Sequence, residues 1–257
     1  MKKILFTLLA ASCSWAIAGT YNIAPATPLS VKVLDDAWNN RENPTNQKII
    51  ADYLTAKPDV PQDYETAWKT ARLVYFIGNY GIGEKAYVST PAGAQLFDYG
   101  VSAAKIAMTL KPNGLEGLYW YAVDLGSYGL AKGVMAAAKG AGPGMDALKK
   151  AMSIDPTYQY YGSSRILGRY YQELPGLMGG SNKKALALLT TATDKAPQFR
   201  SNWLFLGRYY LSVSDYQNAL DACQKAVNSS ALDGKYEEIR YLREANECVT
   251  TAKGNLN

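Results

Sequence analysis

The chain of 257 residues contains no histidine, and this absence limits the chemistry that it could perform. Ser-His-Asp catalysis, Cys-His catalysis and the His-Glu-x-x-His metal site all depend on an imidazole group that titrates near neutral pH. Glycines gather between Gly78 and Gly83 and between Gly140 and Gly144, but neither group precedes the Lys-Ser/Thr pair of a phosphate-binding loop. The sequence therefore favours a non-enzymatic protein that uses no metal and no cofactor.

One pattern of charged residues remains as a candidate binding site. Arg165 and Arg169 are four residues apart, which places them on one face of a helix, and Arg165 is about 200° around that helix from the apolar Leu167. Arg208 holds the position equivalent to Arg169 in the next helical unit, and Lys69 holds it in an earlier unit. We therefore expect the three arginines to share one concave strip, where guanidinium groups would bind a carboxylate.

The candidate groove also needs apolar walls, for which the sequence offers Trp120, Tyr121 and Leu204. An acidic small molecule, a peptide acid or the acidic patch of a protein partner would fit such a groove. The alternative is that the arginines are ordinary solvated charges, or that they form salt bridges with Glu173 or Asp194.

A repeated helical pattern must position these residues. Trp203, Leu206, Gly207 and Tyr210 have the W-x2-L-G-x2-Y spacing of a tetratricopeptide first helix. A second helical pattern follows, in which small residues recur seven apart, at Ala219 and Ala226, where two helices of a hairpin come close. Such a hairpin cannot bury its apolar face alone, so the pattern predicts neighbouring hairpins of the same kind.

Weaker copies of the pattern precede this unit. Their first helices contain Leu167-Gly168-x2-Tyr171, the run from Leu118 to Ala122, and Trp68-x2-Ala71-x3-Tyr75. The sequence thus predicts an all-α fold, a tetratricopeptide-like solenoid of helical hairpins with elaborated loops between paired helices. We expect the loops at 78–89, 126–144 and 174–181 to lie on one rim and to form the partner surface, because equivalent loops of a solenoid project from the same edge.

The predicted organisation has three parts. Residues 1–18 form a signal peptide, residues 19–62 form an extended lead-in and an N-terminal helical cap, and residues 63–257 form the repeat array. Within the cap, short amphipathic patterns predict helices at 29–40 and 45–57. Within the array, the pattern from Lys235 to Lys253 predicts a C-terminal capping helix.

The first residues indicate secretion. Lys2 and Lys3 precede an apolar run and the small-x-small site that ends at Ala18, which predicts cleavage after Ala18 and a periplasmic protein. Cys13 lacks the usual leucine three residues before it, so lipoprotein anchoring is not expected. The mature chain keeps 25 basic and 22 acidic residues, a net charge of about +3, with the signs interspersed. This balance argues against a nucleic-acid partner.

The mature chain keeps two cysteines, Cys223 and Cys248. They lie on consecutive predicted helices, and disulfides form in oxidising compartments such as the periplasm. We therefore predict a disulfide between them.

The runs 118–122 and 167–171, together with Pro175-Gly-Leu-Met-Gly-Gly180 leading into Lys183-Lys-Ala185, resemble the T component (TatT) of TRAP transporters, a periplasmic tetratricopeptide-like family. The resemblance covers residues 67–226. It implies a non-enzymatic helical protein, trimeric in that family, that associates with a periplasmic solute-binding protein and holds a small apolar or organic-acid ligand. The second hypothesis is a general envelope scaffold for assembling pili, polysaccharide or outer-membrane machinery, and the third is an enzyme.

Overall fold

The computed structural model describes residues 30–56, 59–80, 91–230 and 235–256, and these residues form helices joined by short connections. The predicted signal peptide and most of the predicted loop at 78–89 lie outside the described residues. The α-helices are α1 (Val31–Asn39), α2 (Pro44–Thr55), α3 (Tyr64–Tyr80), α4 (Pro91–Leu110), α5 (Leu115–Lys132), α6 (Val134–Ile154), α7 (Tyr158–Glu173), α8 (Asn182–Lys195), α9 (Arg200–Ser212), α10 (Tyr216–Asn228) and α11 (Lys235–Leu256), and a short 3-10 helix, η1 (Gly176–Met178), separates α7 from α8.

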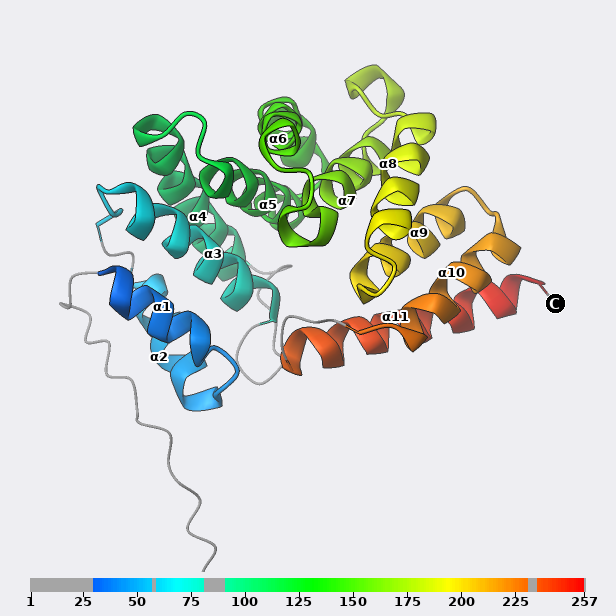
Figure 1. The fold of residues 1–257 in the computed structure, drawn as a ribbon, viewed down its shortest axis with the longest axis horizontal. Helices are drawn as coiled ribbons and strands as arrows, with labels where there is room; N and C mark the ends of the chain where they lie inside the picture. Colours follow the sequence, from blue (N-terminus) through cyan, green and yellow to red (C-terminus); the bar gives the residue numbers. More distant parts are fainter. Residues whose placement is uncertain (1–29, 57–58, 81–90, 231–234, 257) are drawn as a thin grey trace, which may run out of the picture.

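Consecutive helices pack as antiparallel hairpins, which pair α3 with α4, α5 with α6, α7 with α8 and α9 with α10. Figure 1 shows these hairpins as an arc that runs from α3 through α6 to α10. Helix α11 lies along the lower side, with its N-terminal end beside α3 and its C-terminal end beside the last hairpin. The fold is the predicted all-α, tetratricopeptide-like solenoid.

Small residues let the two helices of the last hairpin approach each other. Ala219 and Ala226 on α10 have no exposed surface, at the two positions where the sequence predicts a close contact. Gly207 on α9 faces α10 so closely that a Cβ atom at this position would lie 2.4 Å from the sulfur of Cys223. The glycine of the tetratricopeptide pattern is therefore required here by helix contact.

The two N-terminal helices cover the outer end of the array. The Ser30 hydroxyl accepts a hydrogen bond from the Val33 amide at the start of α1, and the Asn43 side chain caps α2 just before Pro44. Leu34 of α1 is buried in the same apolar cluster as residues of α2, α3 and α4. These two helices fall within one or two residues of the ranges 29–40 and 45–57 that the sequence predicts to be helical.

The predicted loop at 126–144 is instead helical, because it forms the end of α5 and the first half of α6. The two helices meet at Gly133, whose φ of 96° suits glycine. At their crossing, a Cβ atom on Gly129 would lie 2.7 Å from the Cα atom of Ala137. Glycine and alanine are weak evidence for a loop when such close packing of two helices is available, and the loop prediction is wrong for this reason.

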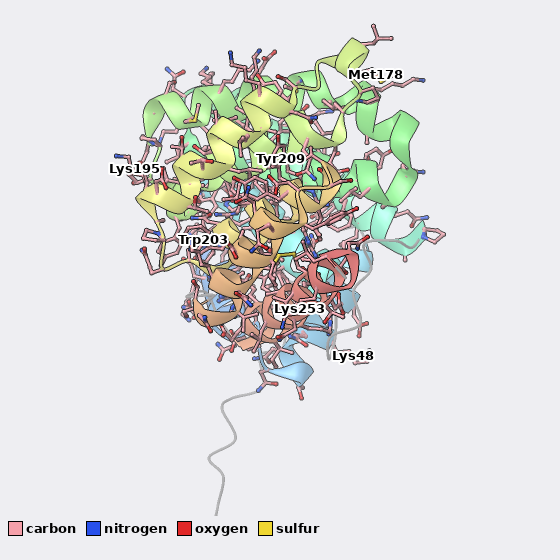
Figure 2. The ribbon with its side chains drawn as sticks, turned by 90° about the vertical axis from the view of Figure 1, so that its right-hand side faces the viewer. Lys48, Met178, Lys195, Trp203, Tyr209 and Lys253 are labelled. Atoms are coloured by element: carbon pink, nitrogen blue, oxygen red, sulfur yellow. A yellow bond between two sulfur atoms is a disulfide. The ribbon has the colours of Figure 1, made fainter. Side chains whose placement is uncertain are left out.

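The segment at 174–181 contains η1 and projects from the array between α7 and α8. Leu177 is fully exposed there, and Figure 2 labels Met178 in this projecting turn. Among the described helices, none combines the length and the apolar character that a membrane crossing needs.

Asp124 is a carboxyl group buried between α5 and α4. It has no exposed surface, and neither carboxyl oxygen has a hydrogen-bond partner among the described residues. A Cβ atom at Gly100 would lie 2.4 Å from Oδ2, so the carboxyl group fills the space that this glycine leaves. Burial raises the pKa of Asp124 well above the ordinary value of 3.8.

We expect Asp124→Asn to raise the free energy of unfolding at about pH 8 by about 1–3 kcal/mol, and to change it little at about pH 4. The pKa is higher in the folded than in the unfolded chain, so the contribution of Asp124 to stability is complete below 3.8 and is lost as the pH rises through the folded-state pKa. Asparagine keeps the shape and does not ionise. Urea unfolding at both pH values measures the effect, with the exposed Asp98→Asn as the control. An equal gain at both pH values would contradict the prediction.

Candidate functional site

A cavity of about 240 Å³ lies on the inner side of the arc. Its walls come from the first helix of every hairpin (α3, α5, α7 and α9), from α6 and from α11. Most of its surface is apolar, and the α5–α6 wall consists largely of small residues, including Gly126, Gly129, Ala137 and Ala138. The cavity is therefore a joint product of all four hairpins and the C-terminal helix.

Three arginines from successive elements line this cavity, namely Arg169 of α7, Arg208 of α9 and Arg240 of α11. One carboxylate, Glu244 on α11, is shared by two of them, because Arg208 Nη2 lies 3.0 Å from its Oε2 and Arg240 Nε donates to its Oε1 over 2.9 Å. Arg169 has the weaker partner. Its Nε lies 3.7 Å from Oε1 of Glu173, which is an ion pair beyond hydrogen-bond distance.

Burial and charge act together on these groups. Burial lowers the pKa of Arg169, with a further decrease caused by Arg208 and a partial compensation by Glu173. Burial alone would raise the pKa of Glu244, but the two neighbouring guanidinium groups of Arg240 and Arg208 bring it below its ordinary value of 4.5. The carboxylate of Glu244 is thus firmly ionised, whereas the positive charge of Arg169 is the least compensated in the cavity.

The C-terminal helix closes one side of the cavity by contacting α3. Arg240 Nη1 donates to the carbonyl oxygen of Asn79 over 2.6 Å. The hydroxyl of Tyr80 donates to that of Tyr241 over 3.0 Å, and the hydroxyl of Tyr75 lies 3.4 Å from the same oxygen. Burial raises the pKa of Tyr75 and of Tyr80 well above 10, so these phenols are neutral donors and acceptors engaged with one another.

Arg169 and Arg208 line the cavity together, but Arg165 does not join them, and its prediction as an outward-facing residue is wrong. Arg165 is only 6% exposed. Its Nη1 donates to Oδ1 of Asn202 over 2.8 Å, and the guanidinium group lies over the ring of Phe199. Arg165 is therefore buried between α7 and α9, on the side of α7 opposite Leu167.

The predicted walls Trp120, Tyr121 and Leu204 also lie outside the cavity lining, because all three are buried in the protein interior. The indole N–H of Trp120 donates to the hydroxyl of Tyr158 over 3.2 Å. Leu204 packs in the apolar cluster that contains the two cysteines. Aromatic and leucine positions of first helices thus serve contacts between hairpins, and the cavity is instead walled by residues such as Ile166 and Phe205.

Lys69 directly follows Trp68, as Leu204 follows Trp203, so its predicted equivalence to Arg208 is wrong. Lys69 is also buried, and its Nζ lies 2.6 Å from Oδ2 of Asp35 on α1. This lysine therefore binds the N-terminal cap and takes no part in the cavity.

Sequence reasoning missed Arg240 and Tyr241, because the apolar stripe from Lys235 to Lys253 predicts only the packing face of a capping helix. A second stripe was present. Arg240, Tyr241 and Glu244 are spaced i, i+1 and i+4, which places them together on another face of α11. That spacing could have indicated a functional face, but only the position of α11 beside α3 in the structure shows what this face contacts.

Cys223 of α10 and Cys248 of α11 are joined as a disulfide, with their Cα atoms 5.8 Å apart. Both residues are buried with Ala226, Ala245 and Leu204. The disulfide fixes α11, and with it Arg240 and Tyr241, to the last hairpin. Among the described residues, no cluster of acidic or cysteine side chains has the number of ligands that a metal site needs.

Comparison with known proteins identifies the fold and no family. No protein-family model matches the chain, and no curated protein does. Among solved structures, the chain is similar to TTC0263, a thermophilic TPR protein of Thermus thermophilus, at a TM-score of 0.55 and 19% identity over 83% of this chain and 96% of that one. A weaker similarity links it to MamA, with a TM-score of 0.41 and 20% identity over 62% of this chain and 88% of that one.

Proposed function

We propose that this protein is a non-enzymatic periplasmic adaptor of the tetratricopeptide-like type that serves TRAP-type solute uptake. In this proposal it associates with a solute-binding protein and holds an acidic group of a ligand or partner on its inner face. The observation that carries the proposal is the cavity formed by all four hairpins, in which Arg169 and Arg208 lie together with Arg240.

Three further features support this assignment. The first residues have the pattern of a cleavable signal peptide. A disulfide between Cys223 and Cys248 is typical of an oxidising compartment. The tetratricopeptide-like solenoid is an architecture that presents an extended concave binding surface. The mass of the secreted chain tests the location, because cleavage after Ala18 predicts a protein that begins at Gly19.

We expect Arg169→Ala to weaken binding of the acidic partner at least tenfold, which corresponds to about 1.4 kcal/mol. Arg208→Ala is expected to weaken binding as well. The reason is that Arg169 faces the cavity with its charge only partly compensated by Glu173. Affinity is measured by calorimetry with the solute-binding protein identified by capture from a periplasmic extract, and circular dichroism verifies folding of each variant.

Arg243→Ala is the matched control, because Arg243 is an exposed arginine of α11 that does not line the cavity. We expect it to bind within twofold of the unmodified protein. If Arg169→Ala and Arg208→Ala also bind within twofold of the unmodified protein, both residues are ordinary solvated charges and the proposed binding site is wrong. Capture of secretion or wall-assembly components would favour the envelope scaffold, and the native mass tests the trimer that the TRAP resemblance implies.

A further inference from the structure

The cavity has the dimensions of a site for a small molecule. Its volume of about 240 Å³ lies just below the range of about 300–1,000 Å³ that is usual for clefts that bind drug-sized ligands. At about 30 Å³ for each water-sized group, a volume of about 240 Å³ corresponds to a molecule of at least about eight non-hydrogen atoms. A folded segment of a partner protein needs more space than this.

The α5–α6 wall creates this space. Because Gly129 contacts Ala137 at the crossing of the two helices, no large side chain stands between them and the cavity. Leu130, Ile166 and Phe205 complete an apolar lining. The body of a ligand in this space would therefore be hydrocarbon, since the small polar share of the lining offers few partners to a hydroxylated molecule.

The polar groups of the cavity differ in what they already bind. Arg208 and Arg240 share Glu244, and the hydroxyl of Tyr170 donates to the carbonyl oxygen of Ala122. The Arg169 side chain makes no hydrogen bond to any residue that the structure describes, although its guanidinium group lines the cavity and lies 5.5 Å from the ring of Phe205. A guanidinium group in this setting offers two parallel N–H donors, which match the two oxygens of one carboxylate.

Building on the proposed function, we propose that the cavity binds one small monocarboxylic acid with a short apolar body, and that Arg169 holds its carboxylate. The α5–α6 wall holds the hydrocarbon. The ligand class therefore includes medium-chain fatty acids and arylalkanoic acids of about ten non-hydrogen atoms. Glu173, the only carboxylate in the lining among the described residues, disfavours a second negative charge on the ligand.

Isothermal titration calorimetry of the purified protein with octanoate and with phenylacetate tests this inference. Octanamide serves as the neutral analogue of the same shape as octanoate. We expect at least one acid to bind, and octanamide to bind at least tenfold more weakly than octanoate if octanoate is that acid, because the amide loses the charge and one acceptor oxygen. Binding of neither acid, or equal binding of octanoate and octanamide, would overturn the proposal.

Two pairs of variants locate the site. Arg169→Gln is expected to weaken acid binding at least tenfold, whereas Arg243→Gln leaves it within twofold. Ala138→Trp fills the cavity from the α6 wall and is expected to abolish binding, whereas Lys139→Trp adds the same ring at the next, exposed residue and preserves it. Circular dichroism shows whether each variant folds. Acid binding that survives both Arg169→Gln and Ala138→Trp places the ligand elsewhere and contradicts the inference.

The same variants separate this inference from the adaptor function. If Ala138→Trp abolishes acid binding but still captures the solute-binding protein, the acid site stands and the partner binds on another surface. If the acid binds and no solute-binding protein is captured, the adaptor function fails and the inference stands. If a peptide with a free C-terminal carboxylate binds at the cavity and neither acid does, the site belongs to a protein terminus and the inference is wrong.

Discussion

Replacing Arg165 by methionine is expected to lower the free energy of unfolding by about 3 kcal/mol or more, because it removes a buried charged donor and leaves its acceptors unpaired. Nη1 of Arg165 donates to Asn202 and also to the carbonyl oxygens of Gln159, at 3.3 Å, and Tyr160, at 3.4 Å. Asn202 is fully buried, so its Oδ1 would be left without this donor, whereas the Tyr160 carbonyl would keep its bond from the Asn202 amide.

The acceptors belong to an unusual backbone turn at the start of α7. Gln159, Tyr160 and Tyr161 have φ values of 52°, 52° and 62°, in the left-handed region that non-glycine residues rarely adopt. Such a conformation costs roughly 1–2 kcal/mol per residue, so other contacts must hold it. Arg165 binds two of its carbonyl groups, and the Asn202 side chain, fully buried, donates to the Tyr160 carbonyl as well.

The Asn202 amide also donates to the carbonyl oxygens of Ala192, at 2.9 Å, and Ala196, at 3.1 Å, at the end of α8. The pair of Arg165 and Asn202 therefore joins α7, α8 and α9. Chemical unfolding followed by circular dichroism measures the effect of Arg165→Met. Arg169→Met, one helical turn away on a partly exposed side chain, is the control and is expected to change stability by less than about 1 kcal/mol. Equal losses for the two variants would contradict a special role for Arg165.

The position of Arg165 also shows that the exposure of a polar residue in a solenoid cannot be predicted from one apolar stripe. Arg165 lies on the side of α7 away from Leu167, as the sequence predicts. It would be exposed there if α7 packed against other helices on one side only. A first helix in a solenoid, however, packs against its own second helix and against the first helices of two neighbouring hairpins. Leu167 lies in the central apolar cluster, and Arg165 meets Asn202 of α9 on the opposite side. A single apolar stripe therefore cannot say which polar residues are exposed.

The hairpins themselves could be predicted because their signals are local. The W-x2-L-G-x2-Y pattern specifies an apolar stripe and a glycine, and Gly207 contacts the partner helix as that pattern requires. The cavity could not be predicted in the same way. It depends on contacts between residues 161 positions apart, as in the bond from Arg240 to Asn79, and on the crossing of α5 and α6, whose glycines resemble a loop in the sequence.

Breaking the bond between Cys223 and Cys248 is expected to lower the free energy of unfolding by about 3 kcal/mol, because a disulfide that closes a loop of this length restricts the unfolded chain. The two cysteines are 25 positions apart in the sequence. The variant is the double substitution Cys223→Ala and Cys248→Ala, which keeps small apolar groups in a site that has 0% and 4% exposure. Unfolding in urea with and without a reductant measures the loss.

Unfolding with and without the reductant separates the contribution of the disulfide to stability from that of side-chain packing. Reduction should destabilise the unmodified protein by nearly as much as the double substitution does, and should leave the double variant unchanged. The sulfurs are buried beside Gly207, so the reductant must act on the unfolded chain to reach them. The loss matters for the cavity because α11 carries Arg240 and Tyr241. Without the disulfide, α11 would be held at that side by its bonds to α3 and by the ion pair of Glu244 with Arg208 of α9. Two free thiols per chain in the unreduced, denatured protein would show that the bond does not form, and the prediction would then fail at its first step.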